Sequence, residues 1–122
     1  MEIIKHTSLT GFTVEDLKKL FSDSKLKSAK IYNSCMYEDY TIEKLKKSEI
    51  KEFEPIDGIY VEYGLVATYN FCRETEPFTV EKLLESLPND NPDLVLERDI
   101  EDGYRYADYE VILITNEYVV FC

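Results

Sequence analysis

Three short stretches of the chain share one order of aromatic, polar and apolar residues. Each starts with an aromatic residue, continues with Thr, then Val or Ile, then Glu, and reaches a Leu five positions after the aromatic; the stretches are residues 12–17, 40–45 and 78–83. The Thr hydroxyl can accept a hydrogen bond from a free backbone N–H of a helix's first turn, so Thr suits the N-cap. The Glu then lies near the positive end of the helix dipole, and the aromatic can pack on the Leu. The pattern predicts helix starts after Thr13, Thr41 and Thr79.

The three stretches are separate caps rather than a structural repeat. The spacings of the Thr residues are 41 − 13 = 28 and 79 − 41 = 38, whereas a solenoid needs a fixed period. The apolar spacing after each cap predicts helices over residues 14–21, 42–53 and 80–87. Pro88 ends the third helix. Residues 25–30 are predicted to add a second helical turn after the first helix.

The predicted strands cluster late in the chain. Residues 58–72 are rich in Tyr, Val, Ile and Phe and contain Gly64, which indicates two strands turned there or one strand with a bulge. Residues 104–115 are predicted to form one long strand, followed by a turn at 116–117 and a final strand at 118–122. Residues 94–96 are predicted to form a short strand, and residues 3–5 and 30–32 are weaker candidates.

This order of elements predicts an α+β protein with a single domain over residues 1–122. We expect a mainly antiparallel sheet formed by the C-terminal half, packed with two or three short N-capped helices. Residues 109–115 first alternate in polarity and then become apolar on both faces. A strand of this kind needs a cover on each side, and the second cover is either a loop or another copy of the chain in a homodimer.

Charge separates the two halves of the chain. Residues 1–53 hold ten Lys and nine acids, and residues 54–122 hold four cations and sixteen acids, so the halves carry 10 − 9 = +1 and 4 − 16 = −12. An acidic surface repels nucleic acid and membrane headgroups and attracts basic protein surfaces. No apolar run approaches 18 residues, so we expect no membrane span. An odd number of Cys without CxxC spacing is typical of free thiols, and we expect a cytoplasmic location.

The sequence shows no catalytic, cofactor or metal signature, and we predict a non-enzymatic protein. His6 has no Cys or Asp partner by spacing, although a pair with Cys35 or Cys72 could form in space. The dense acidic group at residues 97–103 lacks the ligand order of an EF-hand, so we interpret it as a solvated acidic loop. Lysines on the early helices alternate with acids and are typical of solvated helix faces.

Tyrosines accompany the acids of the second half. Tyr supplies a large and rigid contact area, although it also suits strands in general. Those on predicted strands or their edges are Tyr60, Tyr63, Tyr69, Tyr104, Tyr106, Tyr109 and Tyr118. We therefore predict a face that docks on a basic protein surface, with carboxylates in place of phosphates and Tyr rings in place of bases. The predicted partner-binding residues are Glu97, Asp99, Glu101, Asp102, Tyr104, Tyr106, Asp108 and Glu110.

The charge profile as a bulk property is similar to that of small acidic inhibitors that occupy nucleic-acid-binding sites, such as phage-encoded DNA mimics and anti-CRISPR proteins. It is equally similar to that of acidic immunity proteins that neutralise nuclease toxins. This resemblance implies a partner that is a nuclease or a defence protein, and it carries no residue correspondences. The alternative from another class is a protein that sequesters a nucleotide-like ligand between Tyr or Phe rings and one of Arg73, Arg98 or Arg105.

Overall fold

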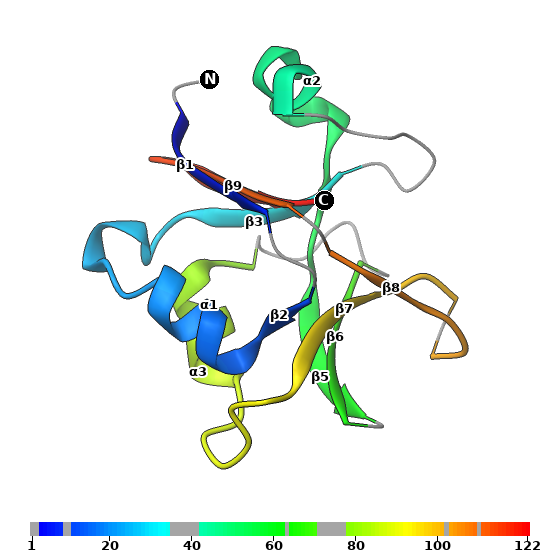
Figure 1. Cartoon of the computed structure of the whole chain (residues 1–122). Coiled ribbons are helices and arrows are strands. Elements are labelled where there is room, and N and C mark those ends of the chain that lie inside the picture. Colours follow the sequence, from blue (N-terminus) through cyan, green and yellow to red (C-terminus); the bar gives the residue numbers. More distant parts are fainter. Residues whose placement is uncertain are drawn as a thin grey trace.

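The strands of the chain assemble into two sheets, with short helices beside them (Figure 1). The structure is a computed structural model that describes residues 3–8, 11–34, 42–62, 64–70, 78–101, 103–109 and 111–122. The elements in chain order are β1 (Ile3–Ser8), β2 (Phe12–Thr13), α1 (Val14–Leu20), η1 (Ser24–Leu26), β3 (Lys30–Asn33), α2 (Ile42–Lys47), η2 (Ile50–Glu52), β4 (Glu54–Pro55), β5 (Gly58–Glu62), β6 (Leu65–Tyr69), α3 (Val80–Ser86), β7 (Val95–Asp99), β8 (Tyr106–Asp108), β9 (Val111–Thr115) and β10 (Tyr118–Phe121).

The first sheet has the strand order β1-β9-β10-β3-β4. Its pairs are antiparallel except for β10 with β3, which are parallel. The second sheet has the order β2-β7-β6-β5, and β8 pairs with β7 on the same side as β2. Its β6–β7 pair is parallel and the others are antiparallel. The protein is therefore a strand-rich mixture of helices and mostly antiparallel strands, as the sequence predicts at this level.

Both halves of the chain supply strands to these sheets. β1 and β3 lie in the first sheet beside the C-terminal strands, and β2 lies in the second. The two weak strand candidates at residues 3–5 and 30–32 are confirmed as β1 and β3. The turn predicted at Gly64 is also confirmed, because β5 and β6 flank it and Gly64 adopts a positive φ of 78°, which glycine tolerates without strain.

Local capping chemistry explains where α1 and α3 begin. Thr13 accepts a hydrogen bond from the backbone N–H of Asp16 at 3.1 Å, and the Asp16 carboxylate accepts one from the Thr13 N–H at 2.9 Å. Thr79 accepts from the backbone N–H of Lys82 at 3.3 Å. Both caps are therefore confirmed as predicted. Thr41, the third predicted cap, lies outside the described residues.

Removing the Thr79 cap is expected to destabilise the protein modestly. Thr79→Ala leaves the Lys82 N–H without its side-chain acceptor, and the unfolding free energy should fall by about 1 kcal/mol. Thr79→Ser keeps the hydroxyl and should stay close to the parent. Urea unfolding of the three proteins measures the difference; equal midpoints for the Ala and Ser variants would contradict the assignment.

Two of the predicted helical segments are shorter than expected. The helix predicted over residues 42–53 ends at Lys47, and the chain continues through the 3-10 turn η2. Phe53 is buried, whereas Ile50 is 38% exposed. The helical turn predicted at residues 25–30 is the single 3-10 turn η1, and β3 begins at Lys30.

The prediction of one long strand over residues 104–115 is wrong. β8 belongs to the second sheet and β9 to the first, so the chain crosses between sheets near Tyr109. Tyr109 is 2% exposed. Its hydroxyl lies 2.6 Å from the Thr68 hydroxyl and also donates to the Asn33 carbonyl oxygen. Thr68 and Asn33 lie in different sheets. Their hydrogen bonds to Tyr109 therefore hold the chain at the point where it passes from one sheet to the other, and the strand is interrupted there.

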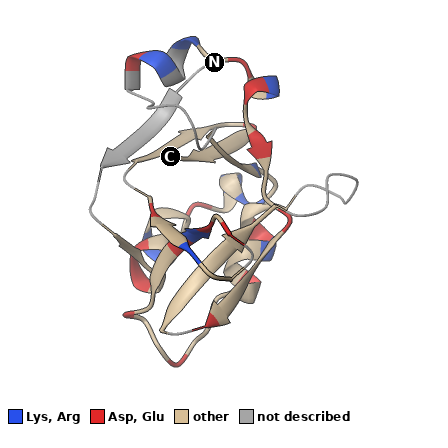
Figure 2. Ribbon diagram, turned by 90° about the vertical axis from the view of Figure 1, so that its right-hand side faces the viewer, with Lys and Arg blue, Asp and Glu red and all other residues tan. Residues whose placement is uncertain are grey.

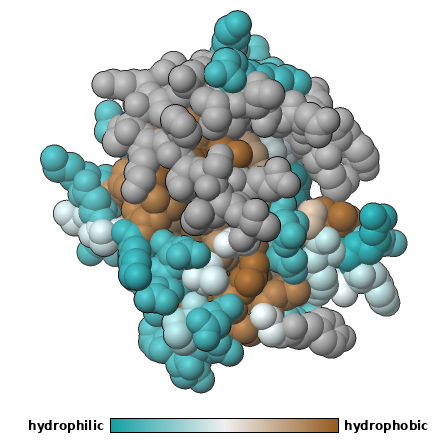
Figure 3. All heavy atoms as spheres, in the orientation of Figure 1, coloured by the Kyte–Doolittle hydropathy of each residue, from teal (hydrophilic) through white to brown (hydrophobic). Residues whose placement is uncertain are grey.

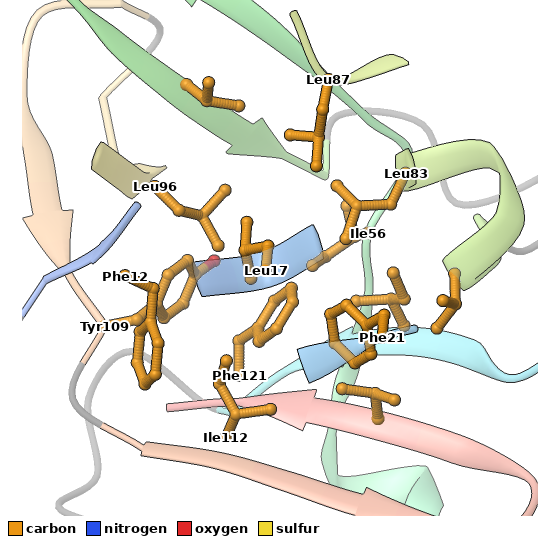
Figure 4. Close-up of a cluster of buried hydrophobic side chains, with 14 of the residues drawn as sticks. Phe12, Leu17, Phe21, Ile56, Leu83, Leu87, Leu96, Tyr109, Ile112 and Phe121 are labelled. Atoms are coloured by element: carbon orange, nitrogen blue, oxygen red, sulfur yellow. The ribbon is translucent and has the colours of Figure 1, made fainter. Parts of the chain in front are cut away.

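The main hydrophobic core lies between the two sheets and the helices α1 and α3 (Figures 1 and 4). In the close-up, Leu17 of α1, Phe121 of β10 and Leu96 of β7 converge on one another. A second, smaller cluster joins Phe53, Leu113 and Val120. β9 thus contributes Ile112 to one cluster and Leu113 to the other, which confirms that it is apolar on both faces. Phe53 shows that the chain itself supplies part of the second cover, and the homodimer stays a prediction.

Candidate partner-binding face

The register of the second sheet brings together residues that lie far apart in the sequence. On β7 the alternate positions Leu96 and Arg98 are buried toward the core side, so Glu97 and Asp99 lie on the opposite face. Their β8 partners are Asp108 for Glu97 and Tyr106 for Asp99.

Two tyrosines of the β5–β6 hairpin share that outer face. Tyr60 pairs with Ala67, which pairs in turn with Glu97. Tyr69 lies two positions after Ala67 and therefore points to the same side. We call this group the tyrosine–carboxylate face; its residues are Tyr60, Tyr69, Glu97, Asp99, Tyr106 and Asp108.

Small residues let the tyrosines lie close to the sheet. Gly58 is the strand partner of Tyr69, and a Cβ atom at Gly58 would lie 2.5 Å from the Tyr69 hydroxyl oxygen. The Tyr69 ring therefore lies across the Gly58 backbone. The rings of Tyr60 and Tyr69 are 6.0 Å apart between centroids and tilted by 35°. Ala67 is fully buried although it belongs to this face, so the larger side chains cover it.

Asp99 is the structural centre of the face. Its Oδ2 accepts a hydrogen bond from the Tyr60 hydroxyl at 2.5 Å, and its Oδ1 accepts from the backbone N–H groups of Glu101 at 3.1 Å and Gly103 at 3.0 Å. The Tyr106 hydroxyl lies 3.3 Å from that of Tyr60. Burial, followed by the bond to Asp99, raises the pKa of Tyr60 well above its usual range, so Tyr60 remains a donor at neutral pH. Asp99 is 5% exposed, and its carboxylate is engaged within the protein.

Glu97 and Asp108 form a pair of carboxyl groups on adjacent strands. Burial raises the pKa of Glu97 to about 7, and a hydrogen bond and charge repulsion from Asp108 act in the same direction. Near neutral pH the Glu97 carboxyl is therefore protonated for part of the time.

The structure places the predicted residues in two different roles. Glu97, Asp99, Tyr106 and Asp108 share the face, and the loop between β7 and β8 carries Glu101 and Tyr104. Asp102 and Glu110 lie outside the described residues. The interpretation of residues 97–103 as a solvated acidic loop is wrong for 97–99, which are strand β7 with Arg98 and Asp99 buried.

Tyr60 and Tyr69 are among the tyrosines on predicted strands, but they are not among the predicted partner-binding residues. The period of two along β5 puts Tyr60 and Glu62 on one side, which is a usable signal. Choosing between the sides requires the pairing of β6 with β7, which joins segments separated by the whole of α3.

Acidic residues also occur away from this face. In the view of Figure 2, Asp and Glu are spread over several elements. Glu81 and Glu85 of α3 and Asp90 and Asp93 after it are exposed. The negative charge is therefore not confined to the tyrosine–carboxylate face, and the arrangement of groups has to be separated from bulk charge by experiment.

The lysines of α1 border a surface depression of about 470 Å³, lined by Glu15, Lys18, Lys19, Ser22 and Pro92. Lys18 donates to the Pro88 carbonyl at 3.3 Å and the Asn89 side-chain oxygen at 3.1 Å, and Lys19 pairs with Glu15 at 3.1 Å. Both ammonium groups are thus already engaged with groups of the chain.

An ion pair between the buried Arg98 and the partly exposed Glu54 connects the two sheets behind the face. Arg98 of β7 donates to the Glu54 carboxylate of β4 at 2.8 Å and to the Ser34 carbonyl, directly after β3, at 2.7 Å. Asn70 donates to the same Glu54 oxygen at 2.8 Å. Arg105 pairs with Glu101 at 3.7 Å, so Arg98 and Arg105 are both engaged in ion pairs within the chain.

The nucleophile pair of His6 with Cys35 or Cys72 falls on residues whose side chains the structure does not describe, and Cys122 is the described cysteine. Burial raises the pKa of the Cys122 thiol to about 11, which lowers its reactivity. His6 lies in β1, and Cys35, Cys72 and Arg73 lie outside the described residues. Across the described ranges, no three His, Cys, Asp or Glu side chains gather as metal ligands. No helix in the described part of the chain is long and apolar enough to cross a membrane.

The fold and the face together define a small strand-rich α/β protein that displays carboxylates and tyrosines on one side of a sheet. Comparison of the chain with protein-family models, with curated proteins and with solved structures finds no match. The geometry of the face is therefore the basis for assigning a function.

Proposed function

We propose that the protein is a small non-enzymatic inhibitor. Its tyrosine–carboxylate face and the adjoining loop dock on the basic, nucleic-acid-binding surface of a nuclease or defence protein in the cytoplasm, as phage counter-defence proteins that mimic DNA do. The observation that carries the proposal is the register of β5, β6, β7 and β8, which gathers carboxylates and tyrosines on one face of the acidic half.

The chemistry of the face suits such a partner. A nucleic-acid-binding groove presents cations for phosphates and flat surfaces for bases. Carboxylates held on a sheet can meet those cations, and tyrosine rings held close to the strands offer flat contact area at low entropic cost. Opposite charges also accelerate association by steering the encounter.

The test compares two variants with equal net charge. The face variant combines Glu97→Gln, Glu101→Gln and Asp108→Asn, and the control combines Glu81→Gln, Glu85→Gln and Asp90→Asn on and after α3. Measured at pH 8, above the raised pKa of Glu97, both gain about three charge units. The parent is screened for inhibition of purified DNA- and RNA-cleaving nucleases, RNA-guided ones included, and association rates are then measured for each variant.

We expect the face variant to associate with an inhibited nuclease at least tenfold more slowly, and the control to change by less than threefold. Inhibition should also weaken steeply between low and high salt because screening shortens the reach of the charges. If the association rates of the two variants fell equally, bulk charge would explain the effect and the face would not. A lack of inhibition across the panel would count against the proposal.

A further inference from the structure

The loop between β7 and β8 displays one exposed aromatic ring. Tyr104 is 84% exposed, the highest value among the exposed large hydrophobic residues of the described chain. The loop projects from the body of the molecule on the right-hand side of Figure 1, and on that side of Figure 3 hydrophilic and intermediate atoms lie beside a few hydrophobic ones. Tyr104 therefore contributes little to the core, and its ring is accessible to another molecule.

A network of hydrogen bonds holds this loop in one conformation. We define the Tyr104 loop as residues 99–101 and 103–106. Tyr104 itself donates its backbone N–H to the Glu101 carbonyl at 2.8 Å, and Ile100 donates to the Arg105 carbonyl at 3.0 Å. The Tyr106 hydroxyl donates to the Gly103 carbonyl at 3.3 Å. Gly103 adopts a positive φ of 86°, which this turn requires.

Asp99, the last residue of β7, connects the same loop to the sheet. Its Oδ1 receives the Glu101 and Gly103 N–H groups, and its Oδ2 receives the Tyr60 hydroxyl. These hydrogen bonds connect the described residues of the loop to the sheet in the absence of a partner. Preorganisation of this kind reduces the entropy lost on binding.

We infer that the Tyr104 ring is a stacking platform for an arginine side chain of the partner, presented by the rigid Tyr104 loop. The inference rests on the proposed function and specifies its partner: the basic surface is read through arginine rather than lysine. A planar guanidinium stacks on an aromatic face and is weakly hydrated, whereas an ammonium is a compact, strongly hydrated charge.

Glu101 supplies a carboxylate in the same loop, and its backbone carbonyl accepts a hydrogen bond from the Tyr104 N–H at 2.8 Å. It is exposed and pairs with Arg105 at 3.7 Å, where both side chains are more than half exposed. A guanidinium of the partner that stacks on Tyr104 can take the place of Arg105 on this carboxylate. Arg105 is thus an internal competitor, and Arg105→Gln should tighten binding of an arginine ligand.

The experiment uses nona-arginine and nona-lysine peptides as probes and titrates the full chain by calorimetry at low salt. We expect the parent to bind nona-arginine more tightly than nona-lysine by about two- to fivefold. Tyr104→Leu, which keeps an apolar side chain without an aromatic face, should abolish this preference, and Tyr104→Phe should keep it. A preference that survives in Tyr104→Leu would overturn the inference.

The positioning role of Asp99 is tested in the same assay. Asp99→Asn keeps Oδ1 as an acceptor for the two N–H groups and should retain the arginine preference, whereas Asp99→Ala should lose it. In the Tyr104→Leu background, Asp99→Ala should have no further effect on the preference, because Asp99 acts through Tyr104. If Asp99→Ala does not fold, Tyr106→Phe, which removes the donor to the Gly103 carbonyl, replaces it.

The outcomes separate this inference from the proposed function. If the triple variant of the face loses affinity for both peptides while Tyr104→Leu leaves the arginine preference intact, the face binds cations but Tyr104 does not read arginine. If the triple variant and its control behave alike, the proposed face fails whatever Tyr104 does.

Discussion

Arg98→Met is expected to lower the unfolding free energy by about 3 kcal/mol, the largest loss that we predict for a single polar residue. The guanidinium is buried, and it donates to the Glu54 carboxylate and the Ser34 carbonyl. Met fills a similar volume but offers no donor. The Ser34 carbonyl would then be left without this bond, and among the described residues Glu54 would keep the bond from Asn70.

Arg105→Met is the matched control, because Arg105 is also paired with a glutamate but is exposed. An exposed pair of this kind contributes about 0–1 kcal/mol. Denaturant unfolding at constant pH measures both variants. Equal stability of the Arg98→Met and Arg105→Met proteins would show that the connection between the sheets is not energetically important.

The double variant Arg98→Met with Glu54→Met separates the pair from its surroundings. Breaking one side of a buried pair leaves a charge without its partner, whereas replacing both sides by apolar residues is often close to neutral. We therefore expect the double variant to recover more than half of the loss seen in Arg98→Met. A double variant less stable than Arg98→Met would indicate that Glu54 stabilises the fold independently of Arg98.

The parts of the fold that depend on local chemistry could be predicted from the sequence. Thr13 and Thr79 cap helices through residues three positions away, and Gly64 turns the β5–β6 hairpin between neighbouring strands. The arrangement of the sheets could not, because β1 pairs with β9 across almost the whole chain and β6 pairs in parallel with β7 across α3. Such pairings depend on the packing of the complete core.

The candidate site was predictable in composition and not in geometry. The acids and tyrosines near residues 97–108 were visible in the sequence, but the strand alternation that separates Glu97 and Asp99 from Arg98 was hidden by an apparent run of charge. Asp99 binds groups of its own chain, and one of them is the Tyr60 hydroxyl. Tyr60 is 39 residues away in the sequence and two strands away in the sheet. A residue that looks like a surface ligand therefore positions the loop.

One strand connects stability with the proposed binding. The core side of β7 carries Leu96, which packs in the main core, and Arg98, which pairs with Glu54 of the first sheet. The outer side of β7 carries Glu97 and Asp99. A shift of β7 by one residue would exchange the two sets. The position of the face is thus fixed by the same contacts that hold the sheets together.

Glu97→Gln is expected to stabilise the protein in a pH-dependent way. Burial and the neighbouring Asp108 raise the pKa of Glu97 to about 7 in the folded state, against 4.5 for the ordinary value. The folded state thus binds more protons than the unfolded state between these values, and stability falls as the pH rises through them. Below pH 4.5 both states are protonated, so the ionisation penalty is absent.

The substitution removes this penalty, since Gln keeps the size and a hydrogen-bond donor toward Asp108 without ionising. Glu97 is only half-buried and solvent screens the pair, so we expect a gain of about 1–2 kcal/mol at pH 8 and little at pH 5. Thermal unfolding at both pH values measures it, with Glu85→Gln as the control for removing one exposed acid from a chain of net charge −11. If Glu85→Gln stabilises at pH 8 as much as Glu97→Gln does, general charge repulsion explains the effect and the Glu97–Asp108 pair does not.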